Sequence, residues 1–151
     1  MAFDWSPTAS KHFQAWSIVR ITGRLPLSVF GAGDIPRQLD TCPGCSAADV
    51  DVRHILHTCP STEGFFAEWV VTVGRVGDAR NGLSWDRLQW ELFAPASCQA
   101  SVPYTAAHIK YVGVAFEETA TAIIDAQNEA SISEYTMNAE ATVTGLLANR
   151  P

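Results

Sequence analysis

Three cysteines and two histidines lie between positions 42 and 59, in the segment CPGCSAADVDVRHILHTCP. Thiolate sulfur and imidazole nitrogen are the atoms that Zn²⁺ prefers in closed, structural sites. Two cysteines separated by two residues can hold one ion from a tight turn, and a second pair must then come from another element. The spacing Cys-x2-Cys-x8-His-x4-Cys supplies both pairs. It predicts a zinc site formed by Cys42, Cys45, His54 and Cys59.

The fourth ligand is less firmly set by spacing than the other three. His57 is a rival to His54, because the two histidines share a face if the segment from Val52 to Thr58 forms a short helix. Spacing favours His54, since His57 is only two residues from Cys59. Cys59 follows His54 by five residues, so it must lie at or beyond the end of that helix, and Pro60 supports an ending there.

Such a site predicts a structural role and no enzymatic activity. Four protein ligands leave no coordination position for a reactive water molecule. Three thiolates and one divalent cation carry a net charge near −1, so the sulfurs require hydrogen bonds from amides or basic side chains, for which Arg53 and Arg37 are candidates. Clustered cysteines indicate a reducing compartment, and the N-terminus lacks the features of a secretory signal. We therefore expect an intracellular protein, nuclear or cytoplasmic, that is not secreted.

Helical spacing of apolar residues dominates the rest of the chain. A first helix is predicted from Ser6 to Gly23, with an apolar stripe that includes Phe13 and Trp16. Residues 24–41 contain two prolines and two glycines and are expected to be an irregular connection. The Cys-Pro-Gly-Cys turn is expected to use a positive φ angle at Gly44.

Three further helices are predicted after the metal segment. Ser61 is expected to cap a helix that ends near Val73, and Ser84 is expected to cap a short helix. On that short helix Trp85 and Trp90 fall on different sides, so one of them is expected to be exposed as an interface anchor. The longest periodic segment runs from Thr105 to about 127, and residues 131–151 are expected to be a further helix or a frayed tail.

These elements predict an all-α fold of five to six helices around one zinc knuckle at residues 42–59. Residues 1–128 are predicted to form a single domain, and residues 129–151 a C-terminal helix or tail. The 151 residues are enough to bury a core, and the composition is that of a globular chain. No apolar run approaches the roughly 20 residues that a membrane span needs.

The formal net charge of −6 is unevenly distributed. The first sixty residues are balanced, whereas the rest carries all the excess negative charge, and Lys110 is the only basic residue between Leu88 and Asn149. An acidic surface repels phosphate backbones. Any contact with RNA or DNA is therefore expected through the basic residues of the first part, namely Lys11, Arg20, Arg24, Arg37 and Arg53. The acidic, aromatic-containing helices that follow would suit a protein partner.

The segment CPGCSAADVDVRHILHTCPSTEGFFAEW resembles the zinc-binding region near the C-terminus of reverse transcriptases from non-LTR retrotransposons. The residues that carry the resemblance are Cys42, Pro43, Cys45, His54, Ile55, Leu56, Cys59, Pro60 and Trp69, and the upstream stretch ITGRLPLSVFGAG is similar too. The likeness covers about residues 16–70 and implies His54 as the fourth ligand. Arg53 departs from it, since an acidic residue often stands there. Neither the polymerase palm nor a nuclease segment is present.

The resemblance implies a non-catalytic structural-zinc module of retrotransposon ancestry that binds nucleic acid. The alternative is a zinc-stabilised interaction module or accessory subunit of a larger assembly.

Overall fold

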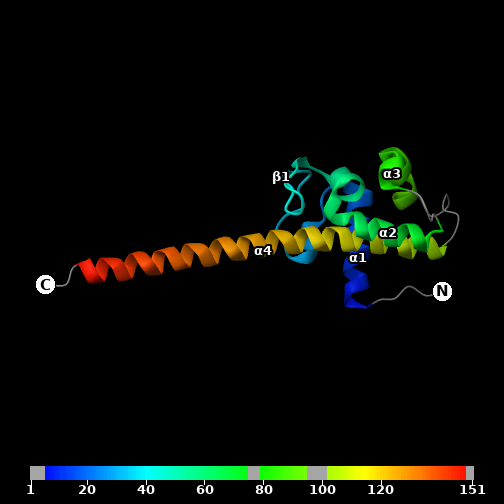
Figure 1. Ribbon diagram of the computed structural model, residues 1–151. Helices are drawn as coiled ribbons and strands as arrows, with labels where there is room; N and C mark the ends of the chain where they lie inside the picture. The colour runs from blue at the N-terminus through cyan, green and yellow to red at the C-terminus, as the bar shows by residue number, and fades with distance from the viewer. Residues whose placement is uncertain (1–5, 75–78, 95–101, 149–151) are drawn as a thin grey trace.

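The chain folds into a mostly helical body with a small two-stranded sheet, as a computed structural model of it shows (Figure 1). The structure describes residues 6–74, 79–94 and 102–148, and the side chains at 104–132 of the last helix. The expectation of a predominantly helical fold is confirmed, but the all-α class is not exact. Trp5, Cys98 and the rest of residues 95–101 lie outside the described residues.

Helix α1 spans Pro7–Thr22 and has the predicted ends. The Ser6 hydroxyl oxygen accepts a hydrogen bond from the Ala9 amide at 3.2 Å, and Gly23 closes the helix with a φ of 67°. The buried face differs from the predicted stripe, because it consists of His12, Ala15, Trp16 and Val19 while Phe13 is exposed. The face is rotated toward His12 because helix α4 approaches α1 closely at that point.

The segment at residues 24–41, which was expected to be irregular, contains a 3₁₀ turn and one strand of the sheet. A 3₁₀ turn, η1, spans Leu27–Phe30, and strand β1 spans Leu39–Thr41. Strand β1 pairs antiparallel with β2, Ala48–Val50, with Leu39 opposite Val50 and Thr41 opposite Ala48. Strands of three residues are too short to show an alternating apolar pattern, so this hairpin could not be predicted from apolar periodicity. Its tip carries Cys42 and Cys45.

The chain continues through short turns into two surface helices. The π-helical turn η2 spans His54–Thr58, the 3₁₀ turn η3 spans Pro60–Thr62, and α2 spans Glu63–Thr72. Ser61 does not cap α2 as predicted, because its hydroxyl faces a cysteine sulfur. A 3₁₀ turn, η4, spans Arg80–Gly82, and α3 spans Trp85–Phe93.

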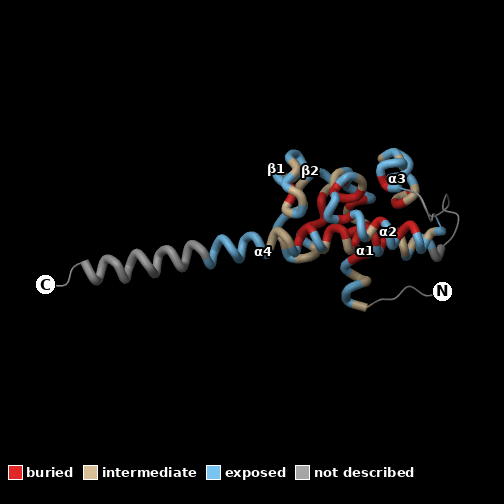
Figure 2. Tube along the Cα trace, in the orientation of Figure 1, coloured by how far each residue is buried: buried red, intermediate tan, exposed pale blue. Residues whose placement is uncertain are grey.

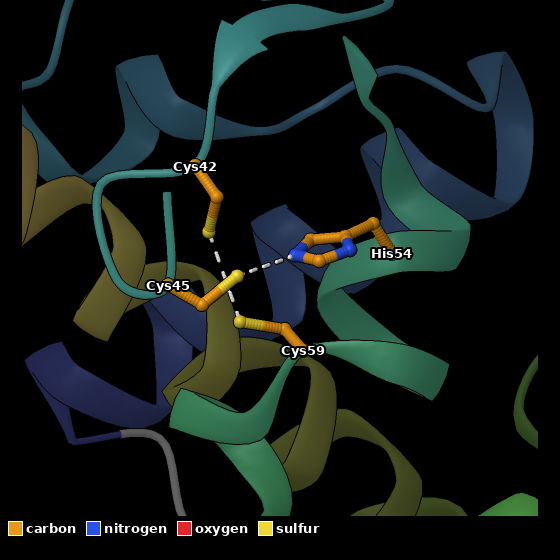
Figure 3. A group of neighbouring side chains, drawn as sticks. All are labelled: Cys42, Cys45, His54 and Cys59. Carbon is orange, nitrogen blue, oxygen red and sulfur yellow. Dashed lines mark hydrogen bonds between the residues drawn. The ribbon is translucent and has the colours of Figure 1, made fainter. Parts of the chain in front are cut away.

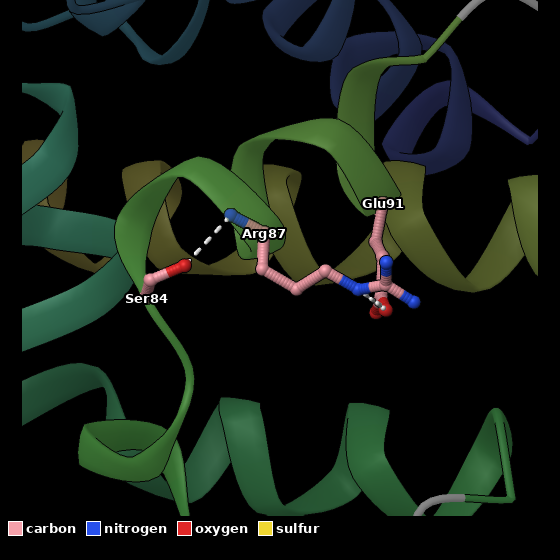
Figure 4. Close-up of polar contacts among 3 residues, drawn as sticks. All are labelled: Ser84, Arg87 and Glu91. Atoms are coloured by element: carbon pink, nitrogen blue, oxygen red, sulfur yellow. Dashed lines mark hydrogen bonds and ion pairs between the residues drawn. The ribbon is translucent and has the colours of Figure 1, made fainter.

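Helix α3 begins as the sequence predicts. The Ser84 hydroxyl oxygen accepts a hydrogen bond from the Arg87 amide at 3.1 Å, and the Arg87 side chain pairs with Glu91 at 2.9 Å (Figure 4). Trp90 is 52% exposed and Trp85 is half-buried, which confirms that one of the two tryptophans faces solvent.

Helix α4 is one continuous helix of 47 residues, Val102–Ala148. Its first half passes through the body beside α1, α2 and η1, and Tyr111, Val112, Phe116 and Ala120 are among its buried residues. Beyond Ile124 it leaves the body as a straight extension, and residues 125–132 are exposed (Figure 2). The predicted C-terminal segment thus continues the helix as far as Ala148, while the division of the chain at residue 128 stays a prediction. Within the described residues, no helix is long and apolar enough to cross a membrane.

Candidate metal centre

Four side chains from two elements converge between the tip of the hairpin and the π-helical turn η2 (Figure 3). Their ligand atoms all lie within 4.8 Å of one another, and the four residues are Cys42, Cys45, His54 and Cys59. Two of them, Cys42 and Cys59, are buried, and the other two are half-buried. The four predicted ligands are therefore brought together, and they could hold a metal ion.

Two of the distances between ligand atoms are close to those of a tetrahedral site. With Zn–S bonds of about 2.3 Å, two sulfurs at the corners of a tetrahedron are about 3.8 Å apart, and a sulfur and an imidazole nitrogen are about 3.6 Å apart. The Cys42 and Cys59 sulfurs are 3.7 Å apart, and Cys45 Sγ lies 3.3 Å from His54 Nε2. The donor set and these two distances are compatible with a tetrahedral divalent ion.

Gly44 allows the hairpin tip to approach the rest of the site. It does not use a positive φ angle as expected, since Ser46 takes that role with a φ of 66°. A Cβ atom on Gly44 would lie 2.4 Å from Ser61 Oγ, so only glycine fits. The amides of Gly44 and Cys45 donate hydrogen bonds to the Cys42 sulfur. Burial nevertheless raises the pKa of the Cys42 thiol to about 11, which a bound cation would offset.

The π-helical turn explains how residues five apart can face the same ion. The Cys59 amide donates to the His54 carbonyl at 2.7 Å, which is the i to i−5 bond of a π turn and brings Cys59 back over His54. Cys59 itself has extended dihedral angles, so it lies just beyond the turn, as predicted. The turn is fixed at its start, because the His54 amide donates to Asp51 Oδ1 at 3.0 Å.

The imidazole of His54 is held for ligation through Nε2. Its Nδ1 lies 3.2 Å from Thr58 Oγ1, and the Thr58 hydroxyl also lies within bonding distance of the His54 carbonyl. A partner on Nδ1 fixes the tautomer that leaves Nε2 free to bind a metal. Burial lowers the pKa of His54, and the positive charge of Arg80 lowers it further against the opposing effect of Asp51. His54 is thus kept neutral, as a ligand must be.

Ser61 is a hydrogen-bond partner of the Cys59 sulfur. The Ser61 hydroxyl lies 2.8 Å from Cys59 Sγ, and the hydroxyl and amide of Ser61 both donate to that sulfur. Burial acts to raise the pKa of Cys59, but these hydrogen bonds outweigh it and lower the pKa below the usual thiol value. Each of the two buried sulfurs therefore has two donors in addition to any metal.

A buried arginine that sequence reasoning missed lies directly behind Cys59. Arg80 is only 5% exposed, and its guanidinium donates to the Cys59 carbonyl and, at 2.8 Å, to Thr62 Oγ1. Its guanidinium carbon also lies 6.0 Å from the centre of the Phe66 ring. In the part of the chain that the structure describes, no carboxylate pairs with Arg80. A buried cation in this position favours a negatively charged metal–thiolate centre beside it.

Tyr111 of helix α4 ties this region to the core. Its hydroxyl donates to the Leu56 carbonyl, and the guanidinium of Arg80 lies near the same hydroxyl. Burial raises the pKa of Tyr111 to about 12, so the hydroxyl stays protonated as a donor. Arg80 stands between the helix predicted to end near Val73 and the one predicted to begin at Ser84, and no sequence signal distinguishes it from a surface arginine. Arg53 and Arg37, the predicted partners of the sulfurs, are both exposed.

His57 contacts a backbone carbonyl outside the group of four candidate ligands. Its Nε2 lies 2.6 Å from the Leu83 carbonyl, and it does not belong to the cluster of ligand atoms. The histidine that the family resemblance implied, His54, is the one that faces the three cysteines (Figure 3).

The five predicted nucleic-acid-binding residues are only partly brought together. Arg20 and Arg53 line the same surface cleft, whereas Lys11, Arg24 and Arg37 are not part of its lining. Lys11 and Arg20 are nine residues apart on α1, which places them on roughly opposite sides of that helix.

The chain was compared with known protein families, proteins and structures. No family model, no curated protein and no solved structure matches the chain.

Proposed function

We propose that the chain is a non-catalytic module folded around one structural Zn²⁺ ion, of the kind that its resemblance to retrotransposon reverse transcriptases implies. The observation that carries the proposal is the set of four ligand atoms, all within 4.8 Å of one another, with one sulfur–sulfur distance of 3.7 Å and one sulfur–nitrogen distance of 3.3 Å. When bound, the ion supplies folding free energy by crosslinking the hairpin tip to the π-helical turn. Four protein donors complete the coordination sphere and leave no position for a substrate.

The charge around the site supports an ion with two positive charges. Three thiolates and one divalent ion give a net charge of about −1, and the buried guanidinium of Arg80 balances it. Without a metal, the raised pKa of Cys42 keeps that thiol protonated at neutral pH, and the arginine would have less anionic charge beside it among the described residues.

Metal analysis of the purified chain tests this proposal. We expect one equivalent of zinc per chain by elemental analysis, and a large drop in melting temperature when a strong chelator removes it. Cys45→Ser or Cys59→Ser should lose the ion and unfold at least residues 40–70. A chain that melts at the same temperature with and without chelator would contradict the proposal.

Nucleic-acid binding is the activity that we propose for this module. The supporting observation is the meeting of Arg20 on α1 and Arg53 beside the metal centre at one cleft. A titration with labelled RNA and DNA at several salt concentrations tests it, because contacts with phosphates predict a steep loss of affinity as salt rises. A chain that binds neither at low salt would exclude this function and leave the zinc proposal standing.

Protein interaction is a second candidate, and the extension of α4 favours it. Residues 125–132 are exposed, Ile132 is 66% exposed, and no basic residue occurs between Lys110 and Arg150. An acidic helix with exposed apolar side chains suits a basic amphipathic helix as its partner. Calorimetric titration with such a peptide tests this, and Ile132→Asp should weaken binding if the extension is the contact.

A further inference from the structure

A surface cleft of about 220 Å³ lies where the end of helix α1, residues 51–53 and helix α3 meet. Its lining combines two arginines with two aromatic rings and an amide: Arg20, Arg53, Trp85, Phe93 and Gln89. The volume is below the roughly 300 Å³ at which pockets for drug-sized ligands begin, so the cleft suits one planar ring at a time.

Arg20 is held in place at one side of the cleft. Its guanidinium carbon lies 5.2 Å from the centre of the Trp16 ring, and that ring is fixed because Trp16 Nε1 donates to the Leu92 carbonyl at 2.9 Å. A guanidinium that is stacked before a ligand arrives loses less freedom on binding an anion.

The two aromatic side chains of the cleft, Trp85 and Phe93, are also held in place by contacts with neighbouring residues. His57 contacts the Leu83 carbonyl just before Trp85, and the His57 and Trp85 rings are 6.2 Å apart. Phe93 packs against Trp16 with ring centres 6.2 Å apart. The two rings of the lining are therefore anchored to the core of the module and do not depend on a ligand for their position.

Charge in the cleft favours an anion. Asp51 also lines it, but its Oδ1 already accepts the hydrogen bond from the His54 amide. Among the described lining residues, two guanidinium groups therefore face one carboxylate, which leaves an excess of one positive charge beside an aromatic surface. Positive groups beside an aromatic platform are the combination that binds single-stranded nucleic acid, where bases stack and phosphates pair with arginine.

We propose that this cleft binds one unpaired nucleotide of a single-stranded nucleic acid, with the base against Trp85 and the flanking phosphates on Arg20 and Arg53. The inference rests on the proposed nucleic-acid function and names the form of nucleic acid and the residues that contact it. A duplex cannot place a base against Trp85, because its bases are stacked inside and only its phosphates are accessible to the arginines.

Fluorescence anisotropy with the full, zinc-loaded chain tests this. The probes are a labelled 12-nucleotide single strand of mixed sequence, as RNA and as DNA, and the corresponding DNA duplex. We expect both single strands to bind at least tenfold more tightly than the duplex, and Trp85→Ala to weaken single-strand binding by about tenfold. Comparison of the RNA and DNA single strands shows whether the cleft prefers ribose or deoxyribose.

Arginine variants give the sharper readout. Arg20→Ala and Arg53→Ala should each make the slope of log affinity against log salt shallower by about 0.7, the value for one phosphate of a single strand. Arg87→Ala is the matched control, because Arg87 is an exposed arginine that pairs with Glu91 and does not line the cleft. Gln89→Glu adds a negative charge to the cleft without removing a buried side chain, so it covers the case in which Trp85→Ala fails to fold.

The outcomes separate the two proposals. If single strands bind but the cleft variants behave like Arg87→Ala, or if the duplex binds as tightly, this inference is wrong and the proposed nucleic-acid function stands. If the zinc-loaded chain binds none of the three probes, both are wrong.

Discussion

The buried Arg80 gives the most direct test of the reasoning about the metal centre. Its guanidinium makes two charge-assisted hydrogen bonds, to the Cys59 carbonyl and to Thr62 Oγ1. Hydrogen bonds to charged groups contribute about 1.5–3 kcal/mol each. We take the lower figure for both, because removing the arginine also removes the cost of burying its charge. Arg80→Ala should therefore lower the free energy of unfolding of the zinc-loaded chain by about 3 kcal/mol.

A loss of this size is easy to measure. For a chain of this length it corresponds to a fall in melting temperature of about 6–12 °C. Denaturant titration of the zinc-loaded chain, with the slope checked to be unchanged, gives the free energy itself. The free energy of unfolding of Arg80→Lys should lie between those of the unmodified chain and Arg80→Ala. Lysine keeps the charge but cannot reach two acceptors with a planar fork. Arg87→Ala, an exposed ion-paired arginine, should change the free energy by less than about 0.5 kcal/mol.

The same titration without metal tests whether the contribution of Arg80 to stability depends on the bound ion. If Arg80 balances an anionic metal–thiolate centre, its removal costs more in excess zinc than in chelator, because the Cys42 thiol, with a pKa raised to about 11, is protonated once the ion leaves. Equal losses in both conditions would refute the charge argument. A loss no larger than that of Arg87→Ala would refute the whole account of Arg80.

Three further predictions follow from the described contacts. His54→Ala should abolish stoichiometric zinc binding in elemental analysis, whereas His57→Gln should keep it. The reverse result would make His57 the fourth ligand in place of His54. Gly113→Ala should destabilise the chain by about 1–3 kcal/mol in denaturant titration, because its Cβ would lie 2.3 Å from the His12 ring. Gly64→Ala, in helix α2 with open space around it, should stabilise the chain by up to about 1 kcal/mol, and equal effects of the two changes would contradict this. Burial lowers the pKa of His108 to about 4, and its Nδ1 accepts from Trp69 Nε1, so the folded state resists protonation that the unfolded chain accepts. Stability should be complete above pH 6.5 and fall by about 3 kcal/mol down to pH 4, and pH-dependent melting of His108→Gln should lack that part of the loss.

The local parts of the fold could be predicted from the sequence because their causes are local. Ser6, Pro7 and Gly23 bound α1, and Ser84 caps α3, through contacts within four residues. The metal cluster could be predicted for the same reason, since all four ligands come from one short segment with a restrictive spacing.

Features that depend on contacts between distant residues could not be predicted. Arg80 is buried because Thr62 and the Cys59 carbonyl accept its hydrogen bonds, and nothing near it in the sequence indicates this. Gly44 is needed for the approach of Ser61 and not for its own dihedral angles. The buried face of α1 is set by His12 against Gly113, a contact across a hundred residues that no helical period reveals.

The compactness of the metal segment also bears on the order of folding. All four ligands lie within residues 42–59, so an ion can close this loop at a small entropic cost while the rest of the chain is still unfolded. Its supports, Arg80 and Tyr111, come from much later in the chain and can join only afterwards. We therefore expect zinc to accelerate refolding as well as to stabilise the final state, because the hairpin and the π-helical turn would act as an early nucleus onto which α4 docks.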